Sequence, residues 1–323
     1  MSLAVVILNW NQAAATIRCV EAVAAWTQVA PAIWVVDNAS QDGSRDLIPK
    51  QCPRAQVLAS DSNLGFAGGN NLALRQILSS RSDVVLLLNN DAVVAEDQVQ
   101  HLMTELETHP RIGVVGPLLD ERRGLPARSA PAFAKPALMG VGRLAQAGQE
   151  KIFTAGGRDI ARHLGTRHEY SSADLPALIA THRLLDVDYV PGTVALVRAE
   201  VFRTVGLFDE DYFFSGEMAD FCRRADAQGY ASAICSRARA VHELGGGARS
   251  TLYRYYTLRN RFLYSRKFYS SRRVLYACLW SAVGLAMAAR SLIQGRPAEA
   301  RAAWHALRDG LAGRFGNRNE LFM

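Results

Sequence analysis

A chain of 323 residues, 49% of them hydrophobic, can bury a large core, which excludes a wholly disordered protein and suits one large domain with an appendage. The formal net charge is +7 at pH 7. Residues 248–323 hold 14 of the 37 basic and 3 of the 30 acidic residues, a net of +11, and the remaining 23 basic and 27 acidic residues give residues 1–247 a net of −4. Only the C-terminal region is therefore expected to meet a polyanionic partner.

The five cysteines are scattered, odd in number and without metal-type spacing, which favours a reducing compartment over a disulfide framework. The first residues lack the basic segment and cleavage site of a signal peptide. The longest apolar run, residues 274–289, is shorter than the roughly 20 residues that span a bilayer, so no transmembrane helix is expected.

Residues 3–115 alternate short apolar runs with helical patterns, which predicts an α/β fold with a mostly parallel sheet built from βαβ units. The expected strands are residues 3–8, 33–36, 57–59, 84–88 and 112–115, and the expected helices are residues 13–26, a segment after residue 71 that ends near residue 79, and residues 96–108.

Residues 118–185 show little periodicity and many Gly, Pro, Ala and Arg residues, so they are interpreted as a variable insertion that contributes to the acceptor region. Regular patterns return at residues 187–197 and end near residue 247. Three helices are expected beyond, at residues 251–268, 273–293 and 297–313. The expected division is a nucleotide-sugar domain at residues 1–248 and a basic helical region at residues 249–323.

Polar residues follow the ends of the predicted strands: Asn9, Asp37, Asn63 and Asp91. Ligands of open α/β sheets bind outside the carboxyl ends of the strands, so a binding site is favoured over a set of unrelated helix caps and turns. Asp37 could accept a hydrogen bond from the imide N–H of uracil or thymine, although the same residue could simply form an Asx turn.

The segment 63–71 carries three glycines, among them Gly65, and would let the backbone approach a ligand closely. It lacks the G-x-G-x-x-G order, and the chain has no G-x-x-x-x-G-K-[ST], so dinucleotide and P-loop sites are disfavoured.

Two further pairs of residues could carry chemistry. Asp91 and His242 could hold a divalent ion, although singly they would be a strand-end cap and a structural histidine. Glu217 and Asp220 share the first turn of a predicted helix, where a carboxylate could act as a general base or could only favour the helix N-terminus.

Taken in order, the motifs of the chain resemble the inverting glycosyltransferase family 2, and especially its rhamnosyltransferase-like bacterial members. The resemblance covers about residues 3–247. The matching segments are residues 5–11, 35–44, 63–71, 86–91, 189–192, 206–210, 213–214 and 241–242.

The resemblance implies the A-type glycosyltransferase fold, a nucleotide-sugar donor and Mg²⁺ or Mn²⁺ as cofactor. It implies that Asp37 contacts the nucleobase and that Asp91, the last residue of a segment in the place of the family's D-x-D motif, binds the metal with His242. The nucleotide-binding residues implied are Asn9, Asp37, Asn63, Gly65, Asn70 and Asn90.

The sequence departs from the family at two positions. Asn89 replaces the first Asp of the D-x-D motif. Met218 stands where the family has the Asp that serves as base, and a thioether cannot accept a proton. Either Glu217 takes that role, with Asp220 as a secondary candidate, or the acceptor chemistry differs, or the protein is not catalytic.

Residues 251–268 interleave aromatic residues with Arg and Lys. This mixture favours a helix in a membrane interface facing anionic headgroups, ahead of a structural cover or dimer surface. Nucleic acid is not expected as a partner.

The predicted function is inverting transfer of a sugar, with L-rhamnose as the expected sugar, from a thymidine or uridine diphosphate to a hydroxyl of a glycan or lipid-linked acceptor. The expected setting is cell-surface polysaccharide synthesis, with the protein peripheral on the cytoplasmic face of the cell membrane. The alternatives are a nucleotidyltransferase and a non-catalytic sugar-nucleotide-binding partner of another transferase.

Overall fold

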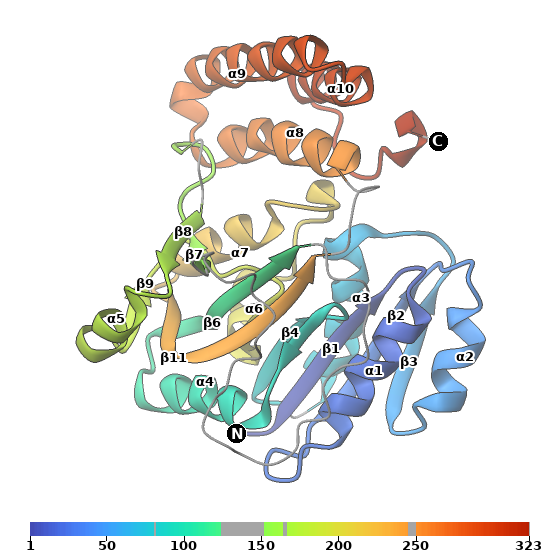
Figure 1. The fold of residues 1–323 in the computed structure, drawn as a ribbon, viewed down its shortest axis with the longest axis vertical. Coiled ribbons are helices and arrows are strands. Elements are labelled where there is room, and N and C mark those ends of the chain that lie inside the picture. Colours follow the sequence, from blue (N-terminus) through green and yellow to red (C-terminus); the bar gives the residue numbers. More distant parts are fainter. Residues whose placement is uncertain (81, 124–151, 164–166, 245–249, 323) are drawn as a thin grey trace.

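The computed structural model describes the chain apart from residues 81, 124–151, 164–166, 245–249 and 323 (Figure 1). A mixed sheet forms its centre, with the strand order β3-β2-β1-β4-β10-β6-β11-β5. The strands of this path are β1 (Leu3–Asn9), β2 (Ala32–Asn38), β3 (Ala55–Ser60), β4 (Val84–Asn89), β5 (Ala92–Val94), β6 (Ile112–Arg123), β10 (Val194–Arg198) and β11 (Ala231–Leu244).

The four strands β3, β2, β1 and β4 run parallel, with β3 at the edge of the sheet and the apolar strands β1 and β4 in its interior. Every residue of β1 from Leu3 to Ile7 is buried, as expected for a strand covered on both faces. The antiparallel β10 then separates β4 from β6. The predicted α/β fold with a mostly parallel sheet is confirmed.

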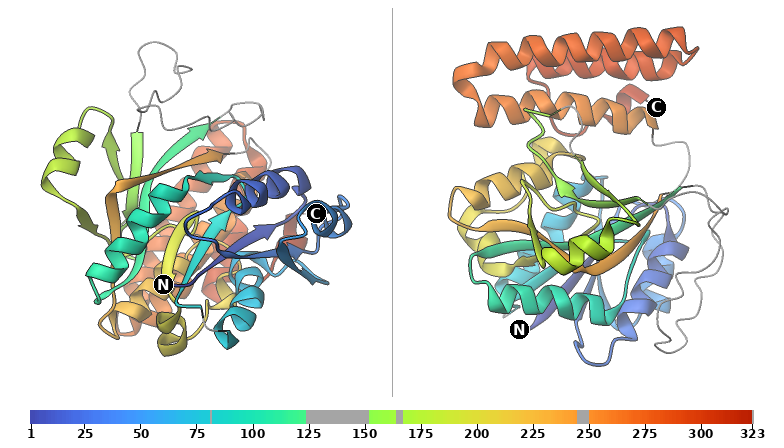
Figure 2. Two further views of the ribbon diagram at one scale, coloured as in Figure 1. Left: turned by 90° about the horizontal axis from the view of Figure 1, so that it is seen from below. Right: turned by 60° about the vertical axis from the view of Figure 1, so that its left-hand side comes forward.

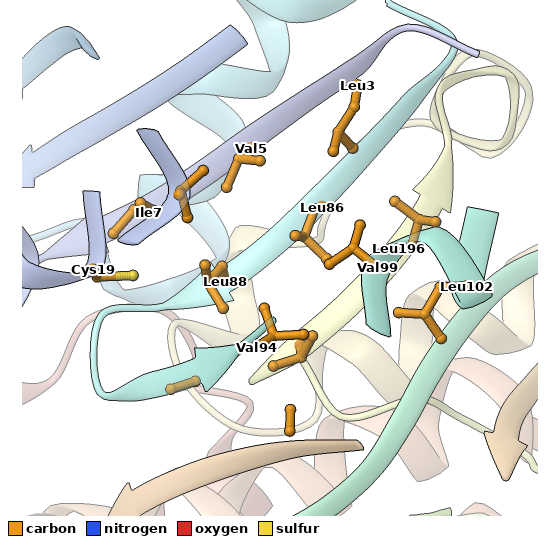
Figure 3. Close-up of a cluster of buried hydrophobic side chains, with 14 of the residues drawn as sticks. Leu3, Val5, Ile7, Cys19, Leu86, Leu88, Val94, Val99, Leu102 and Leu196 are labelled. Atoms are coloured by element: carbon orange, nitrogen blue, oxygen red, sulfur yellow. The ribbon is translucent and has the colours of Figure 1, made fainter. Parts of the chain in front are cut away.

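Helices cover both faces of this sheet (Figure 2). One face packs against α1 (Ala13–Ala24), α2 (Ser44–Gln51) and α4 (Glu96–Thr108), and the other against α3 (Gly65–Ser79), α6 (Ala199–Val205) and α7 (Glu217–Asp226). Figure 3 shows the first of these cores, where Val5 and Ile7 of β1 lie with Leu86 and Leu88 of β4. Alternate residues of the same strands face the second core.

The region interpreted as an irregular insertion contains regular elements. Strand β6 continues to Arg123, the antiparallel pair β7 (Ile152–Gly157) and β8 (Arg167–Ser171) extends from it, and α5 (Leu175–Thr181) and β9 (Leu184–Asp186) follow. These elements are short, and strands of three to six residues offer too few alternations for a periodic pattern. Residues 124–151 of the predicted insertion lie outside the described part of the chain.

The three helices predicted at the C-terminus are confirmed as α8 (Ser250–Phe268), α9 (Arg273–Ile293) and α10 (Pro297–Ala312). Figure 1 shows α8 lying over the α/β domain, with α9 and α10 forming an outer layer above it. A third hydrophobic core joins this helical layer to the domain, and Tyr255 of α8, Trp280 of α9 and Tyr212 before α7 are all at most 1% exposed in it.

The interpretation of residues 251–268 as a membrane-interface helix does not hold for α8. Four of its aromatic side chains (Tyr255, Tyr256, Phe262, Tyr264) are buried, and so are Arg259 and Arg261. Because Arg259 and Arg261 donate hydrogen bonds to backbone carbonyls of the domain, their charges are satisfied inside the protein rather than by headgroups. This helix is a structural cover.

The expectation that no segment is long enough to cross a membrane is also corrected. Residues Ser270–Ile293 form a helix of 24 residues with a mean hydropathy of 1.4, which by length and composition could cross one. The apolar run in the sequence was too short because the helix continues through polar residues at both of its ends. Only 22% of its most apolar window is buried, so this helix is mainly exposed.

Candidate active site

Buried polar side chains meet where β1 and β2 end. The parallel register pairs Asn9 with Asp37, and the Asn9 Nδ2 donates to Asp37 Oδ1 at 2.8 Å and to Ser40 Oγ at 3.0 Å. The backbone N–H of Ser40 donates to the other carboxylate oxygen at 3.3 Å. Asn9 and Asp37 are 0% and 1% exposed, so the carboxylate is fixed in orientation and is covered in this conformation.

Thr16 of α1 extends this network to the end of β4, and sequence reasoning missed it. Its hydroxyl donates to Asn9 Oδ1 at 2.6 Å and accepts from the Asn90 Nδ2 at 2.9 Å. The structure therefore links Asn9 and Asn90 through the buried Thr16 hydroxyl, and Asn9 in turn contacts Asp37. The only signal was a threonine on the apolar face of the predicted helix.

The glycine-rich segment is tied to the end of β2 through Asn38. The Asn38 side chain donates to Asn63 Oδ1 at 3.1 Å and to the Gly65 carbonyl at 3.0 Å, and it accepts from the Leu64 N–H at 2.8 Å. Gly65 has φ +69°, and a Cβ there would lie 2.2 Å from the Phe213 carbonyl oxygen. Glycine is thus required for the start of α3 to touch the loop before α7.

Asn70, also predicted to bind nucleotide, lies one turn into α3. It is 2% exposed, and its Nδ2 donates to the Phe66 carbonyl at 2.8 Å inside its own helix. This bond directs the amide of Asn70 into its own helix.

Asp91 and His242 come together although 150 residues separate them in the chain. Strand β5 pairs with β11 so that Ala92 lies opposite His242, and the His242 Nε2 lies 3.3 Å from Asp91 Oδ1. The His242 Nδ1 is buried and has no hydrogen-bond partner in the part of the chain that the structure describes.

This pair fits a divalent ion. Two ligand atoms at about 2.1 Å from one octahedral ion lie about 3 Å apart, close to the distance found. No cluster of three or more His, Cys, Asp or Glu side chains suited to a metal occurs among the described residues. Mg²⁺ and Mn²⁺ sites commonly complete their shells with phosphate oxygens and water, so two protein ligands suffice for an ion that binds with a nucleotide.

Glu217 is the first residue of α7, and its carboxyl group is buried. Burial, reinforced by the nearby charge of Asp220, raises the pKa of Glu217 from 4.5 to about 7. Its Oε2 has no hydrogen-bond partner within the described residues. A carboxyl with a pKa near neutrality can take and release a proton at physiological pH, as a general base must.

Met218 occupies the place of the family's base, and its side chain is packed. It is 3% exposed and belongs to the core on the α3 side of the sheet. A Cβ on Gly192 would lie 3.2 Å from Met218 Cγ and 2.6 Å from the ring of Phe66. Gly192 therefore packs closely against both Met218 and Phe66 of the first turn of α3.

Asp220 is an ion-pair residue in this structure. It is 0% exposed, Arg224 Nε lies 2.7 Å from its Oδ2, and Lys267 of α8 and the Tyr212 hydroxyl contact its Oδ1. Because both oxygens are engaged by cations, Asp220 holds α7 to α8, whereas Glu217 keeps an unbonded oxygen.

The loop of residues 211–216, which leads into Glu217, has an unusual backbone. Phe213 and Ser215 have φ of 58° and 70°, which side-chain-bearing residues rarely adopt, and Gly216 has φ 106°. On one side, the Phe213 carbonyl accepts a hydrogen bond of 2.7 Å from the Phe66 N–H at the start of α3. Strain of this kind persists only where surrounding contacts impose it.

Helix α8 supplies the contacts on the other side. The Asn260 Nδ2 lies 2.9 Å from the Tyr212 carbonyl, 2.9 Å from that of Phe214 and 2.5 Å from that of Ser215. Arg259 donates to the Asp211 and Tyr212 carbonyls at 2.9 and 3.0 Å. The sequence did not reveal this clamp, because Arg259 reads as part of a basic membrane patch.

Comparison with known proteins tests the family that the sequence resembles. Residues 4–137 match the family model described as Glycosyl transferase family 2. Over these residues, which are less than half of the chain, the sequence is similar to glycosyltransferase family 2. The predicted resemblance to this family is thereby supported, and with it a glycosyltransferase as the class of enzyme.

Two curated relatives of the chain are distant. The chain is 25% identical over 269 residues to the low-salt glycan biosynthesis hexosyltransferase Agl10 of Haloferax volcanii, covering 80% of this chain and 76% of that protein. It is 24% identical over 218 residues to the N-acetylglucosaminyl-diphospho-decaprenol L-rhamnosyltransferase of Mycobacterium tuberculosis, covering 65% of this chain and 66% of that one.

Two solved structures share the fold. GalNAc-T7 with UDP, GalNAc and Mn²⁺ superposes with a TM-score of 0.58 at 16% identity, covering 82% of this chain and 48% of that chain. The mannosyltransferase PcManGT of Pyrobaculum calidifontis, in complex with GDP-Man and Mn²⁺, also gives 0.58, at 12% identity, covering 97% and 87%. The predicted A-type glycosyltransferase fold is confirmed, and this chain spans about half the length of the first of these structures.

Proposed function

We propose that the protein is an inverting glycosyltransferase in which Glu217 accepts the proton of the acceptor hydroxyl. The observation that carries this proposal is the buried, incompletely bonded carboxyl of Glu217, with a pKa of about 7, beside the position where Met218 has replaced the family's base. As the hydroxyl attacks the anomeric carbon, the bond from that carbon to the diphosphate breaks, and the proton passes to Glu217.

The donor in this proposal is a sugar linked to uridine or thymidine diphosphate. Asp37, fixed by Asn9 and Ser40, would accept from the imide N–H of the base. The backbone between Asn63 and Gly65 would line the nucleotide. L-rhamnose remains the proposed sugar, supported by the name of the mycobacterial relative, while the haloarchaeal relative is named only as a hexosyltransferase.

Asp91 and His242 would hold Mg²⁺ or Mn²⁺ in this proposal. The ion would supply positive charge against the charge that develops on the leaving diphosphate. Support comes from the 3.3 Å approach of the two side chains and from the Mn²⁺ in both structures that share the fold.

The proposed acceptor is a glycan or a lipid-linked sugar used in cell-surface polysaccharide synthesis, and the mycobacterial relative is named for such a lipid-linked acceptor. We also propose a peripheral location on the cytoplasmic face of the membrane. The free state of all five cysteines is consistent with a reducing compartment.

The test is the identity of the released product. The purified chain is incubated with a panel of nucleotide sugars, Mn²⁺ and lipid-linked acceptors, and the nucleotide products are separated by ion-exchange chromatography. Release of nucleoside diphosphate supports the proposal. Pyrophosphate would indicate a nucleotidyltransferase, and binding without turnover would indicate a non-catalytic partner.

A further inference from the structure

The outer face of α9 exposes an unbroken apolar stripe. Its exposed side chains between residues 274 and 289 are all uncharged, and they recur with helical spacing. The stripe consists of Val274, Leu275, Cys278, Leu279, Ala282, Leu285, Ala286, Ala289, Leu292 and Ile293. Val274 and Ile293, near its two ends, are 72% and 87% exposed. Contiguous exposed apolar surface of this kind is a binding surface.

Arginines surround this stripe. Arg272 and Arg273 precede it, Arg290 and Arg296 lie at its other end, and α10 beside it exposes Arg301 and Arg308. An open pocket at the start of α9 is lined by Arg266, Arg272 and Arg273, together with two serines and the first stripe residues. Helix α10 also exposes Trp304 and Leu311, at 58% and 57%, between and beyond its two arginines.

The acidic residues of the outer layer point inward. Residues 270–312 contain only two, Glu299 and Asp309. Arg254 of α8 holds Glu299 at 2.6 Å, and the Tyr255 hydroxyl of α8 donates to Asp309 at 2.7 Å. The outward surface is therefore apolar in its middle and positive at its margins.

We propose that this stripe inserts into the surface of an anionic lipid bilayer, with the arginines bound to headgroup phosphates. Apolar side chains bordered by arginine and tryptophan suit the boundary between acyl chains and headgroups. The charges disfavour a second copy of the chain as occupant, because pairing two such faces would set arginines against arginines without an acidic partner on α9.

The stripe lies flat on the bilayer rather than spanning it. The opposite face of α9 is committed to the protein, where Tyr276, Trp280 and Gly284 are buried against α8 and α10. A Cβ on Gly284 would lie 2.4 Å from Leu307 of α10, so the two helices are in close contact. Spanning would require α9 to abandon this core.

Cys278 provides a direct probe, because it lies in the stripe and is the only exposed cysteine of the five. An environment-sensitive fluorophore attached there should gain intensity and shift to the blue on adding vesicles with 30% phosphatidylglycerol, and respond several-fold less to pure phosphatidylcholine. Leu279→Glu with Leu285→Glu should abolish the response. Leu47→Glu, an exposed leucine on α2, is the matched control and should leave it unchanged.

Flotation of the unlabelled chain with the same vesicles gives a second readout. Because both variants change exposed residues, circular dichroism should show that they fold like the parent. Nucleotide binding measured in parallel is expected to be equal in all three proteins, which separates this surface from the proposed reaction. A parent chain that neither floats nor shifts would overturn the proposal. A dimer that forms without lipid, and that the double substitution Leu279→Glu with Leu285→Glu converts to monomer, would also overturn it. Resistance of the reconstituted parent chain to alkaline carbonate extraction would overturn it as well, because it would show that the helix spans the bilayer.

Discussion

At the scale of single residues, the proposed mechanism makes Glu217 the base in place of the adjacent Met218. Glu217→Gln keeps the size and polarity of the side chain and removes its ability to accept a proton. We expect the rate constant of transfer to fall by about 10²–10⁴-fold, with nucleotide affinity within a factor of two of the parent. The measurement is sugar transfer from a radiolabelled donor, with nucleotide binding followed by calorimetry.

Asp220→Asn serves as the comparison for that variant. Asparagine leaves the cations of Arg224 and Lys267 without their carboxylate, so we expect lower thermal stability with a smaller loss of turnover. Turnover by Glu217→Gln equal to the parent's would remove Glu217 as the base. If the parent shows no turnover and Met218→Asp does, the natural protein is a non-catalytic sugar-nucleotide-binding partner of another transferase.

The raised pKa of Glu217 also predicts a pH dependence of stability. Its folded-state pKa, about 7, exceeds the unfolded value near 4.5, so its stabilising contribution is complete below pH 4.5 and is lost as the pH rises to about 7. The loss is at most about 3 kcal/mol. Urea unfolding should therefore show Glu217→Gln gaining stability relative to the parent between pH 5 and pH 8, while exposed Glu21→Gln shows no such trend.

Activity should have the opposite slope. The base must be ionised, so turnover should increase as the pH rises through about 7 and then level off. A pH profile that is flat between 6 and 8, with chemistry rate-limiting, would contradict this assignment.

The metal pair gives a separate prediction at the same scale. Mn²⁺ should raise the affinity of the parent for nucleoside diphosphate by about tenfold or more and should have little effect on His242→Ala or Asp91→Asn. Calorimetric titration with and without EDTA measures this. His101→Ala, on the outer face of α4, is the control, and undiminished activity after exhaustive EDTA treatment would contradict the metal site.

At the scale of elements, the decisive contact joins α8 to the loop that presents Glu217. Asn260→Ala would leave the Phe214 and Ser215 carbonyls without their α8 donor, at a cost of about 1–3 kcal/mol. We expect a lower Tm and a fall in kcat larger than any change in nucleotide affinity, because the strained loop relaxes. Steady-state kinetics and thermal unfolding measure this, and Gln76→Ala on the exposed side of α3 is the control. Unchanged kcat with an altered Tm would show that the clamp is structural only.

The elements also show what could be read from the sequence. Strands β1 and β4 were predictable because each is a continuous apolar run, and α9 and α10 because their apolar residues recur with helical spacing. The approach of Asp91 to His242 was predictable only through family resemblance, since the strand pairing that unites them is non-local. Arg259 and Asn260 could not be identified, because their partners are backbone carbonyls that leave no trace in side-chain patterns.

At the scale of the whole molecule, the C-terminal helices and the catalytic domain share a core. Removing residues 249–323 takes away Tyr255, Trp280 and Arg259, three of the largest fully buried side chains. We expect the truncated chain to aggregate or to unfold well below the parent, and the intact chain to unfold in a single transition. Calorimetry checks both. A truncated chain with parental Tm would restore the division at residue 248 as a true domain boundary.

The position of the clamp late in the chain has a consequence for biosynthesis. A ribosome first delivers β2, which carries Asp37, and the turn between β4 and β5, which carries Asp91, and α8 emerges only after the loop that it must hold. A nascent or prematurely terminated chain can therefore assemble the nucleotide-binding edge before the base is in position. Under the proposed mechanism, such a fragment would bind the donor without being able to transfer its sugar, so competence for transfer would arise only in chains whose synthesis has passed α8.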